Sequence, residues 1–329
     1  MANVLKIQRA YCVELKKTMS IDTARCEFFS LPENERKRFN FLCSDEICRF
    51  HNNDVGVRVT GVNYDKLCKE QIDGQRPIQG AHYRKNDEHH PECEWSINLR
   101  LEESLEQLDS ESNDDFAQRK LHSKLNHFIN VFDPDSDDEV ASASDSEQRN
   151  QPRSNALGTS SGDKHHNHVK RNSPSKTKTS VLSRLVETWL EAKETLSEPE
   201  FKQLEVAIKG YGNTLLYRYF KPVKYFENRA EANVVYGGAT LTSRYGLGFK
   251  LRFFDRINDQ AVYLYCSKEQ MENYRFRRYI DAILDSDCRY FKVYFLKQNV
   301  VVKDGYITCE VSSLKNIHIV PVMDESKKK

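Results

Sequence analysis

The feature that most constrains the fold is a long central stretch with few large apolar residues. From about Asp109 to Thr179, Ser, Asp, Asn, Gln and Lys dominate, and an acidic run is followed by a basic one. Such a segment buries too little apolar surface to offset the entropy lost on ordering. We therefore predict a disordered linker over residues 106–179, which divides the 329-residue chain into two folded parts. Within it, only Leu121 to Phe132 has apolar residues at helical spacing, which indicates a transient helix or a docking segment.

The cysteines concentrate before this linker. Six of the nine lie in the first 93 residues. The chain has no apolar run near eighteen residues, and its first residues lack the apolar core of a signal peptide. We therefore predict a cytoplasmic protein with no membrane segment, in which the thiols stay reduced. In that setting a cysteine cluster favours a metal over disulfides.

Two pairs of metal-binding residue types flank a segment of roughly forty residues within the predicted β-rich module 1–105. Cys43 and Cys48 enclose four residues, and His90 and Cys93 enclose two. Either spacing lets one tight turn present two ligands, and structural zinc takes four nitrogen or sulfur ligands in a tetrahedron. We predict a bound zinc ion held by Cys43, Cys48, His90 and Cys93.

Several alternatives remain open around this site. His89 is the main alternative to His90, and Cys26, His51 and Cys68 leave a second metal open. Glu92 and Glu94 lie nearby, but no HExxH motif or HxE…PCxxC pattern occurs. A catalytic zinc needs an open coordination position and a general base, so a structural role is favoured.

The same segments resemble the N-terminal zinc-finger region of competence CoiA-like bacterial proteins. The resemblance rests on Cys-x4-Cys, on a strand ending in Gly61-Val62, on Gly80-Ala81-His82-Tyr83-Arg84 and on His-His-Pro-x-Cys, within about residues 10–95. It implies the same four ligands, with His82 as a structural residue beside them. The first knuckle is longer here than the family's Cys-x-x-Cys, and Tyr83 stands where the family has Phe. The family's nuclease part has no counterpart downstream, so nuclease activity is not implied.

The part that follows the linker begins with helical patterns and then changes to strands. The spacing of an amphipathic helix is found in Leu182, Leu185, Val186, Trp189 and Leu190. A capping box at Ser197 begins a second helix, so we predict a helical hairpin over 180–212. Residues 213–323 then give three strands, a helix and two strands, the element order of an OB-fold, a small Greek-key barrel. The predicted strands are 233–236, 247–254, 261–266, 290–302 and 306–311, the helix is 268–284, and 324–329 is a charged tail.

The predicted barrel is basic and rich in aromatic residues. Residues 213–303 hold sixteen Lys or Arg against nine Asp or Glu, a surplus of seven. Cations that hold phosphates and rings that stack on bases are typical of single-strand binding. Alternation places Lys250 and Arg252 on one face of a strand, and Phe249, Leu251 and Phe253 on the other, in the core. The candidate nucleic-acid-binding residues are Arg244, Tyr245, Lys250, Arg252, Arg275 and Arg278.

The sequence thus predicts an α+β protein with a zinc module, a linker, a helical hairpin and an OB-like barrel. We expect a nucleic-acid-binding accessory protein of a prokaryote or mobile element, in contact with single-stranded DNA or RNA. The alternative is a protein-interaction adaptor that binds a partner through the linker or the helical hairpin. We expect no enzymatic activity, because no Gly-rich phosphate loop, Gly-x-Ser-x-Gly elbow or carboxylate-Lys nuclease signature occurs.

Overall fold

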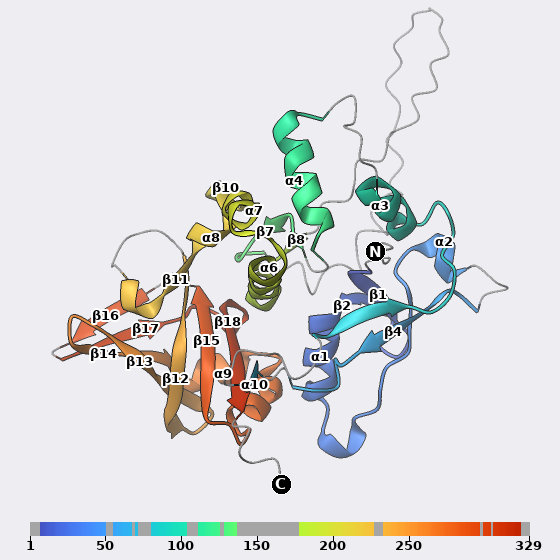
Figure 1. Ribbon diagram of the computed structural model, residues 1–329. Helices are drawn as coiled ribbons and strands as arrows, with labels where there is room; N and C mark the ends of the chain where they lie inside the picture. Colours follow the sequence, from blue (N-terminus) through green and yellow to red (C-terminus); the bar gives the residue numbers. More distant parts are fainter. Residues whose placement is uncertain are drawn as a thin grey trace, which may run out of the picture.

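The computed structural model describes residues 7–50, 55–67, 70–71, 80–103, 111–125, 128–136, 178–226, 233–296, 299–303 and 305–323. Helices and strands are mixed along these residues, as an α+β protein requires. Figure 1 shows the N-terminal module (blue and cyan) beside a large C-terminal sheet (orange and red), with green and yellow elements above the seam between them. Within the described ranges, no helix has the length and apolarity needed to cross a bilayer.

The N-terminal module is an antiparallel sheet in the order β2-β1-β3-β4-β6. Its strands are β1 (Arg9–Cys12), β2 (Lys17–Ser20), β3 (Phe41–Cys43), β4 (Arg58–Val62) and β6 (His82–Lys85). Its helical elements are α1 (Ile21–Ser30), the 3-10 turn η1 (Glu33–Glu35), α2 (Glu46–Arg49) and α3 (Glu94–Glu103).

Helix α1 covers one face of this sheet. Ser20 ends β2 and caps α1, since its hydroxyl accepts a hydrogen bond from the Thr23 backbone N–H at 3.2 Å. Strand residues alternate between the two faces, and those turned toward α1 are buried. Together they form the module's core, which includes Ala10, Cys12, Phe41, Val59 and Tyr83 from the sheet and Ala24 and Phe28 from α1.

The middle of the chain forms a second core around α6 (Leu182–Thr195). A small sheet in the order β10-β9-β7-β8 packs with it. Its strands are β7 (Val131–Phe132), β8 (Lys178–Thr179), β9 (Glu205–Ile208) and β10 (Gly212–Leu215), and the other helices here are α4 (Asn113–Ser123), α7 (Glu198–Gln203) and α8 (Leu216–Tyr219).

Two expectations about the middle of the chain are corrected. Part of the interval 106–179 is ordered, because Leu125, Ile129 and Phe132 are buried in the second core; its remaining residues, 106–110, 126–127 and 137–177, lie outside the described ranges. The hairpin over 180–212 is also wrong in its second half. The capping box at Ser197 does begin α7, but that helix ends at Gln203 and Glu205–Ile208 form strand β9.

The C-terminal sheet has the order β16-β17-β14-β13-β12-β15-β18-β5, with β11 alongside β12. Its elements are β5 (Glu70–Gln71), β11 (Phe220–Pro222), η2 (Val223–Tyr225), β12 (Val234–Tyr245), β13 (Gly248–Ile257), β14 (Gln260–Cys266), α9 (Lys268–Asn273), α10 (Arg277–Leu284), β15 (Tyr290–Leu296), β16 (Asn299–Lys303), β17 (Tyr306–Glu310), η3 (Leu314–Asn316) and β18 (Ile317–Met323). One face packs on α9 and α10 around Phe249, Leu251 and Phe253, which confirms these three as core residues.

The predicted OB-like barrel over 213–323 is wrong. A barrel closes when its terminal strands pair, but here β16 and β5 are the two ends of an open sheet. The predicted strand 290–302 is two strands, β15 and β16, which lie far apart in the sheet order because β16 pairs with β17. The residues 324–329 of the predicted tail lie outside the described ranges.

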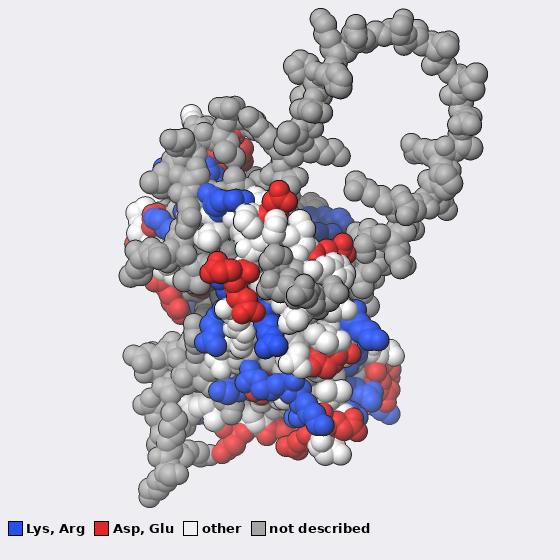
Figure 2. Space-filling view, turned by 90° about the vertical axis from the view of Figure 1, so that its right-hand side faces the viewer, with Lys and Arg blue, Asp and Glu red and all other residues white. Residues whose placement is uncertain are grey.

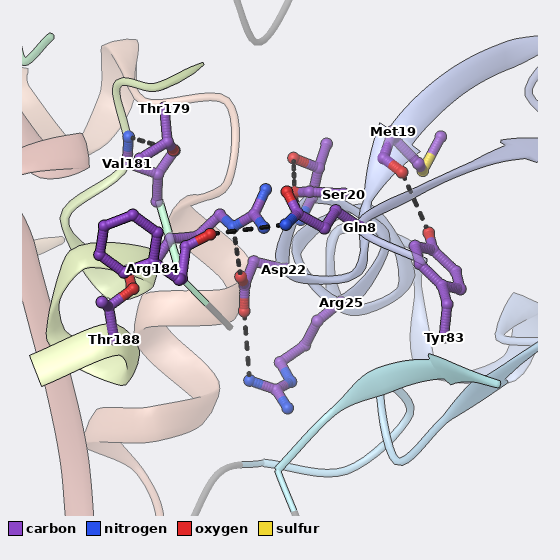
Figure 3. Close-up of polar contacts among 12 residues, drawn as sticks. Gln8, Met19, Ser20, Asp22, Arg25, Tyr83, Thr179, Val181, Arg184 and Thr188 are labelled. Atoms are coloured by element: carbon purple, nitrogen blue, oxygen red, sulfur yellow. Dashed lines mark hydrogen bonds and ion pairs between the residues drawn. The ribbon is translucent and has the colours of Figure 1, made fainter. Parts of the chain in front are cut away.

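The N-terminal module docks on the other two cores through α1. Asp22 of α1 lies between Arg25 of the same helix, at 3.8 Å, and Arg184 of α6, at 3.9 Å, as Figure 3 shows. Glu27 of α1 pairs with Lys17 at 2.5 Å and with Arg275 at 2.6 Å. These buried carboxylates fix the module against the rest of the chain.

Candidate functional site

A candidate metal site lies at one end of the N-terminal sheet. The metal cluster consists of four buried side chains: Cys43, Cys48, His89 and Cys93. Their ligand atoms all lie within 4.8 Å of one another. Cys43 Sγ is 3.7 Å from Cys93 Sγ, and His89 Nδ1 is 3.5 Å from Cys93 Sγ and 3.7 Å from Cys48 Sγ.

Local hydrogen bonds hold the two ligand-bearing turns together. Cys43 ends β3 and Cys48 lies in α2, while Cys93 precedes α3. The Asp45 carboxylate joins both turns, because it accepts from the Ile47 N–H at 3.0 Å and from the Glu94 N–H at 2.8 Å. Cys43 and Cys48 are further tied to Val57 by backbone hydrogen bonds of 2.9 Å. The cluster is therefore preorganised by its backbone.

The fourth member of the cluster is His89, which corrects the prediction of His90. The His90 backbone N–H points to Cys48 Sγ at 3.3 Å, and its carbonyl accepts from the Cys93 N–H at 2.9 Å. His90 Nδ1 accepts instead from the Glu92 N–H at 3.2 Å, so its ring is engaged by its own turn. His90 thus shapes the turn, and its neighbour supplies the ligand atom.

The other candidate ligands do not join this cluster. Cys26 lies in α1 and forms no second group of metal-binding side chains with other described residues. His51 and Cys68 lie outside the described ranges. His82, beside the site in the resemblance, donates through Nδ1–H to the Gly80 carbonyl at 2.9 Å.

The three thiols of the cluster differ in pKa, because they contact one another and are buried. The hydrogen bond with Cys43 lowers the pKa of Cys93, burial opposes this, and His89 lowers the pKa further. The same contact with Cys93, followed by burial, raises the pKa of Cys43, and burial raises that of Cys48 to about 11. The Cys93 thiol is therefore the most acidic of the three, and a cation would displace the protons that remain.

The spacing of the donors fits a tetrahedral zinc ion. Zn–S bonds of about 2.3 Å in a tetrahedron place two sulfur atoms about 3.8 Å apart. The distance of 3.7 Å between Cys43 and Cys93 agrees with this value. Three cysteines and one histidine are also a usual donor set for structural zinc. Because the protein fills all four positions, the cluster fits a structural metal better than a catalytic one.

A second candidate site is the side of the C-terminal sheet that faces away from α9 and α10. Strand register places Lys250 beside Tyr265, and Arg252 beside Tyr263 and Thr240. Helix α6 covers part of this side, where Trp189 contacts Tyr236 and Tyr294. We define the open face as the aromatic and charged side chains turned this way beyond that contact, on β12 to β15 and β17: Tyr245, Lys250, Arg252, Phe254, Arg256, Tyr263, Tyr265, Tyr290, Lys292, Tyr306 and Glu310. Among these, Glu310 is the one carboxylate.

Phe254 forms a flat apolar platform on the open face. Its side chain is 59% exposed, although large apolar side chains are normally buried. The ring lies over Gly238, where an added Cβ would come within 2.8 Å of it, and it meets Tyr290 edge-on at 5.5 Å. A glycine at this position therefore allows the ring to lie against the sheet with its other side in solvent.

Cations surround this platform. Lys250 Nζ lies 4.1 Å from the centre of the Tyr263 ring and 5.3 Å from that of Tyr306. Arg252 is exposed on the same strand, next to Phe254 in the alternation. Tyr245 is 51% exposed and meets Tyr265 at 6.3 Å. The structure thus brings three of the predicted residues, Tyr245, Lys250 and Arg252, to one face.

The other three predicted residues lie elsewhere and have partners within the protein. Arg244 pairs with Asp281 of α10 at 3.0 Å and with Asp285, the C-cap residue of that helix, at 3.3 Å. Arg275 pairs with Glu27, and Arg278 donates to the Ser30 carbonyl at 2.8 Å. Arg275 and Arg278 therefore attach α1 to the C-terminal sheet domain, and Arg244 attaches β12 to α10.

Sequence reasoning missed several aromatic residues of the open face. Phe254, Tyr263, Tyr265, Tyr290 and Tyr306 lie among other aromatic residues in the sequence, many of which are core residues. The alternation that separates Lys250 and Arg252 from Phe249 and Leu251 also assigns Tyr263 and Tyr265 to the exposed side. Comparisons with protein families, with curated proteins and with solved structures found no match for this chain.

Proposed function

We propose that this protein is a zinc-containing, nucleic-acid-binding accessory protein of a prokaryote or mobile element that binds single strands on the open face. It acts in the cytoplasm and catalyses no reaction. The observation that carries the proposal is the exposed Phe254 ring beside Arg252, on a face that holds further tyrosines and cations. The zinc ion in the metal cluster has a structural role.

Each part of this face matches one requirement of single-strand binding. An unpaired base exposes its flat surface, and an exposed ring offers a complementary one. Phe254 offers such a surface, and Tyr245 offers another that is half exposed. Lys250 and Arg252 lie beside them and supply positive charge for phosphates. Duplex bases are stacked on one another, so this platform favours single strands over duplexes.

The adaptor alternative makes a different use of the molecule. It requires a protein partner on the middle elements and leaves the open face without a ligand. Of the segments on which it was based, the described residues 111–125, 128–136 and 178–212 form elements that pack around the second core. Nucleic-acid binding is therefore the better supported proposal.

The test is binding of labelled single-stranded and duplex DNA and RNA to the full chain. Phe254→Ala removes the platform, and we expect a loss of about 1–3 kcal/mol, or roughly 5- to 150-fold in affinity. Tyr225→Ala is the matched control, because Tyr225 is 63% exposed beside Lys224 but lies in η2, outside the open face. If both variants bind like the unmodified protein, or if no strand binds at low salt, the adaptor alternative gains support.

A further inference from the structure

The outer face of the N-terminal sheet, opposite α1, carries a group of arginines. Alternate residues of β4 turn outward, since Val59 is buried and Arg58 is exposed. In the register, Thr60 lies opposite Arg84 of β6, which is also exposed. Arg58 therefore lies diagonal to Arg84 on the same face, and such neighbours are about 7–8 Å apart. Figure 2 shows this side of the molecule, on which Lys and Arg side chains are interspersed with Asp and Glu.

Arg58 and Arg84 differ from their neighbours in lacking a charged partner among the described residues. Arg9 pairs with Glu94 at 3.6 Å, and Arg49 pairs with Glu46 at 3.2 Å. The Asp87 carboxylate accepts from the Arg58 backbone N–H at 3.1 Å and forms no ion pair with the Arg58 guanidinium. No ion pair joins the Arg58 or Arg84 guanidinium to a carboxylate in the described ranges.

Two neighbouring guanidinium groups that form no ion pair with a described carboxylate repel each other, so this arrangement favours a bound anion. A guanidinium donates two parallel hydrogen bonds to a phosphate, which a lysine cannot do. The Thr60 side chain lies between them in the register, and its hydroxyl donates to Asn86 Oδ1 at 2.9 Å. The face thus has the composition of a phosphate-binding surface.

Unlike the open face, the described strands of this sheet turn no free Phe, Tyr or Trp ring outward. Tyr11 turns outward on β1, but the Arg49 guanidinium covers its ring at 4.6 Å. Arginines without stacking rings contact the backbone of a nucleic acid and carry no sequence information. The open face therefore suits the bases of a strand, and the arginine face suits its phosphates.

We propose that Arg58 and Arg84 form a second contact surface, which holds the phosphates of the bound strand. The identity of the ligand rests on the proposed function, whereas the surface is defined by the N-terminal sheet alone. Helix α1 lies on the opposite side of that sheet and docks on the C-terminal domain, so the two contact surfaces belong to one ordered body.

The experiment measures the salt dependence of binding to a labelled oligothymidylate of about 30 nucleotides, long enough to reach more than one surface. Each phosphate contact on a single strand contributes about 0.7 to the slope of log affinity against log salt. Replacing both arginines, as Arg58→Ala with Arg84→Ala, should lower the slope by about 1.4. Phe254→Ala should lower the affinity and leave the slope unchanged.

The matched control removes the same charge from loops of the same module. Lys37 lies between η1 and β3, Lys66 lies after β4, and both are exposed. The variant Lys37→Ala with Lys66→Ala should keep the original slope. Retention of the metal and of Trp95 fluorescence shows that each variant is folded.

The outcomes separate the two proposals. If the arginine variant behaves like the lysine control while Phe254→Ala weakens binding, the second surface is refuted and the open face stands. If only the arginine variant loses affinity and slope, the second surface stands and the open face is refuted. Polyglutamate carries negative charges but no phosphate. If it displaces the strand, and the arginine variant keeps the original salt slope, the phosphate assignment is also refuted.

Discussion

The metal cluster and the open face differ in how the chain brings their residues together. The ligands of the metal cluster come from two short turns, each fixed by hydrogen bonds within a few residues. The residues of the open face come from several strands and meet only through the sheet register. Local spacing therefore identifies the metal site well, whereas the open face depends on the complete topology.

The two regions also differ in what stabilises them. The C-terminal sheet is packed between two large apolar cores, one around α9 and α10 and the other around α6. The N-terminal module has a smaller core, and its metal cluster joins β3 to the turn before α3. We therefore expect metal removal to affect the module far more than the rest of the chain.

The largest expected effect is loss of the metal. Cys43→Ser should abolish zinc binding and unfold the module, because a structural zinc contributes about 10–16 kcal/mol of apparent binding free energy in small zinc-finger peptides. Trp95 reports the module and Trp189 reports the second core. Elemental analysis should give one zinc per chain before the change and none after it, with altered Trp95 fluorescence and unchanged Trp189 fluorescence.

Cys12→Ser is the matched control for that variant. Cys12 is fully buried in the same core but lies outside the metal cluster. The control should keep one zinc per chain. Zinc retention by Cys43→Ser, or equal loss from both variants, would contradict the assignment of the ligands.

A smaller effect is expected in the region that the sequence predicted to be disordered. Asp133 is fully buried and pairs with Lys209 at 2.9 Å and Lys178 at 3.0 Å. Asp133→Asn should destabilise the second core by about 1–3 kcal/mol, because both lysines remain solvated while the charge-assisted bonds are lost. Urea unfolding followed by Trp189 fluorescence, in a Trp95→Phe background, measures the change.

The pH dependence of stability gives a second test of the ion pairs of Asp133. Burial alone would raise the pKa of Asp133, but Lys209 and Lys178 outweigh it and hold that pKa below its ordinary value. The stability from this carboxylate is therefore complete above its unfolded pKa of about 3.9, and is lost as the pH falls through the folded pKa. The difference between wild type and Asp133→Asn should stay constant above about pH 5 and shrink below about pH 4. A constant difference down to pH 2 would show that the ion pairs do not form.

Sequence patterns predicted the metal site up to its histidine. The thiols were identified because two cysteines in one turn and a third beside histidines form an unusual local pattern. Choosing between His89 and His90 requires the turn geometry, since the two differ by one residue and only one ring can face Cys48 and Cys93. Spacing alone does not contain that information.

The errors in the fold have a similar cause. Residues Leu204, Val206 and Ile208 alternate as a strand does, yet Phe201, Leu204 and Ile208 also fit a helix, and packing against β7 favours the strand. The segment from Leu121 to Phe132 contains enough apolar residues to join a core only when α6 is present to cover them. The predicted order of elements joined β15 to β16 in one strand, and an order of elements does not state which strand pairs with which.

The smallest expected effect concerns the cations on and near α10. Arg275 was predicted to bind nucleic acid, but its guanidinium lies 2.6 Å from Glu27 and is 52% exposed. Arg275→Ala should change stability by less than about 1 kcal/mol, because the pair is partly solvated and Lys17 still neutralises Glu27 at 2.5 Å. It should leave the oligonucleotide affinity and its salt slope unchanged, whereas Arg252→Ala should lower the slope by about 0.7. If Arg275→Ala and Arg252→Ala lower the affinity and the slope equally, the α10 side of the sheet also binds the strand. The assignment of binding to the open face alone would then be refuted.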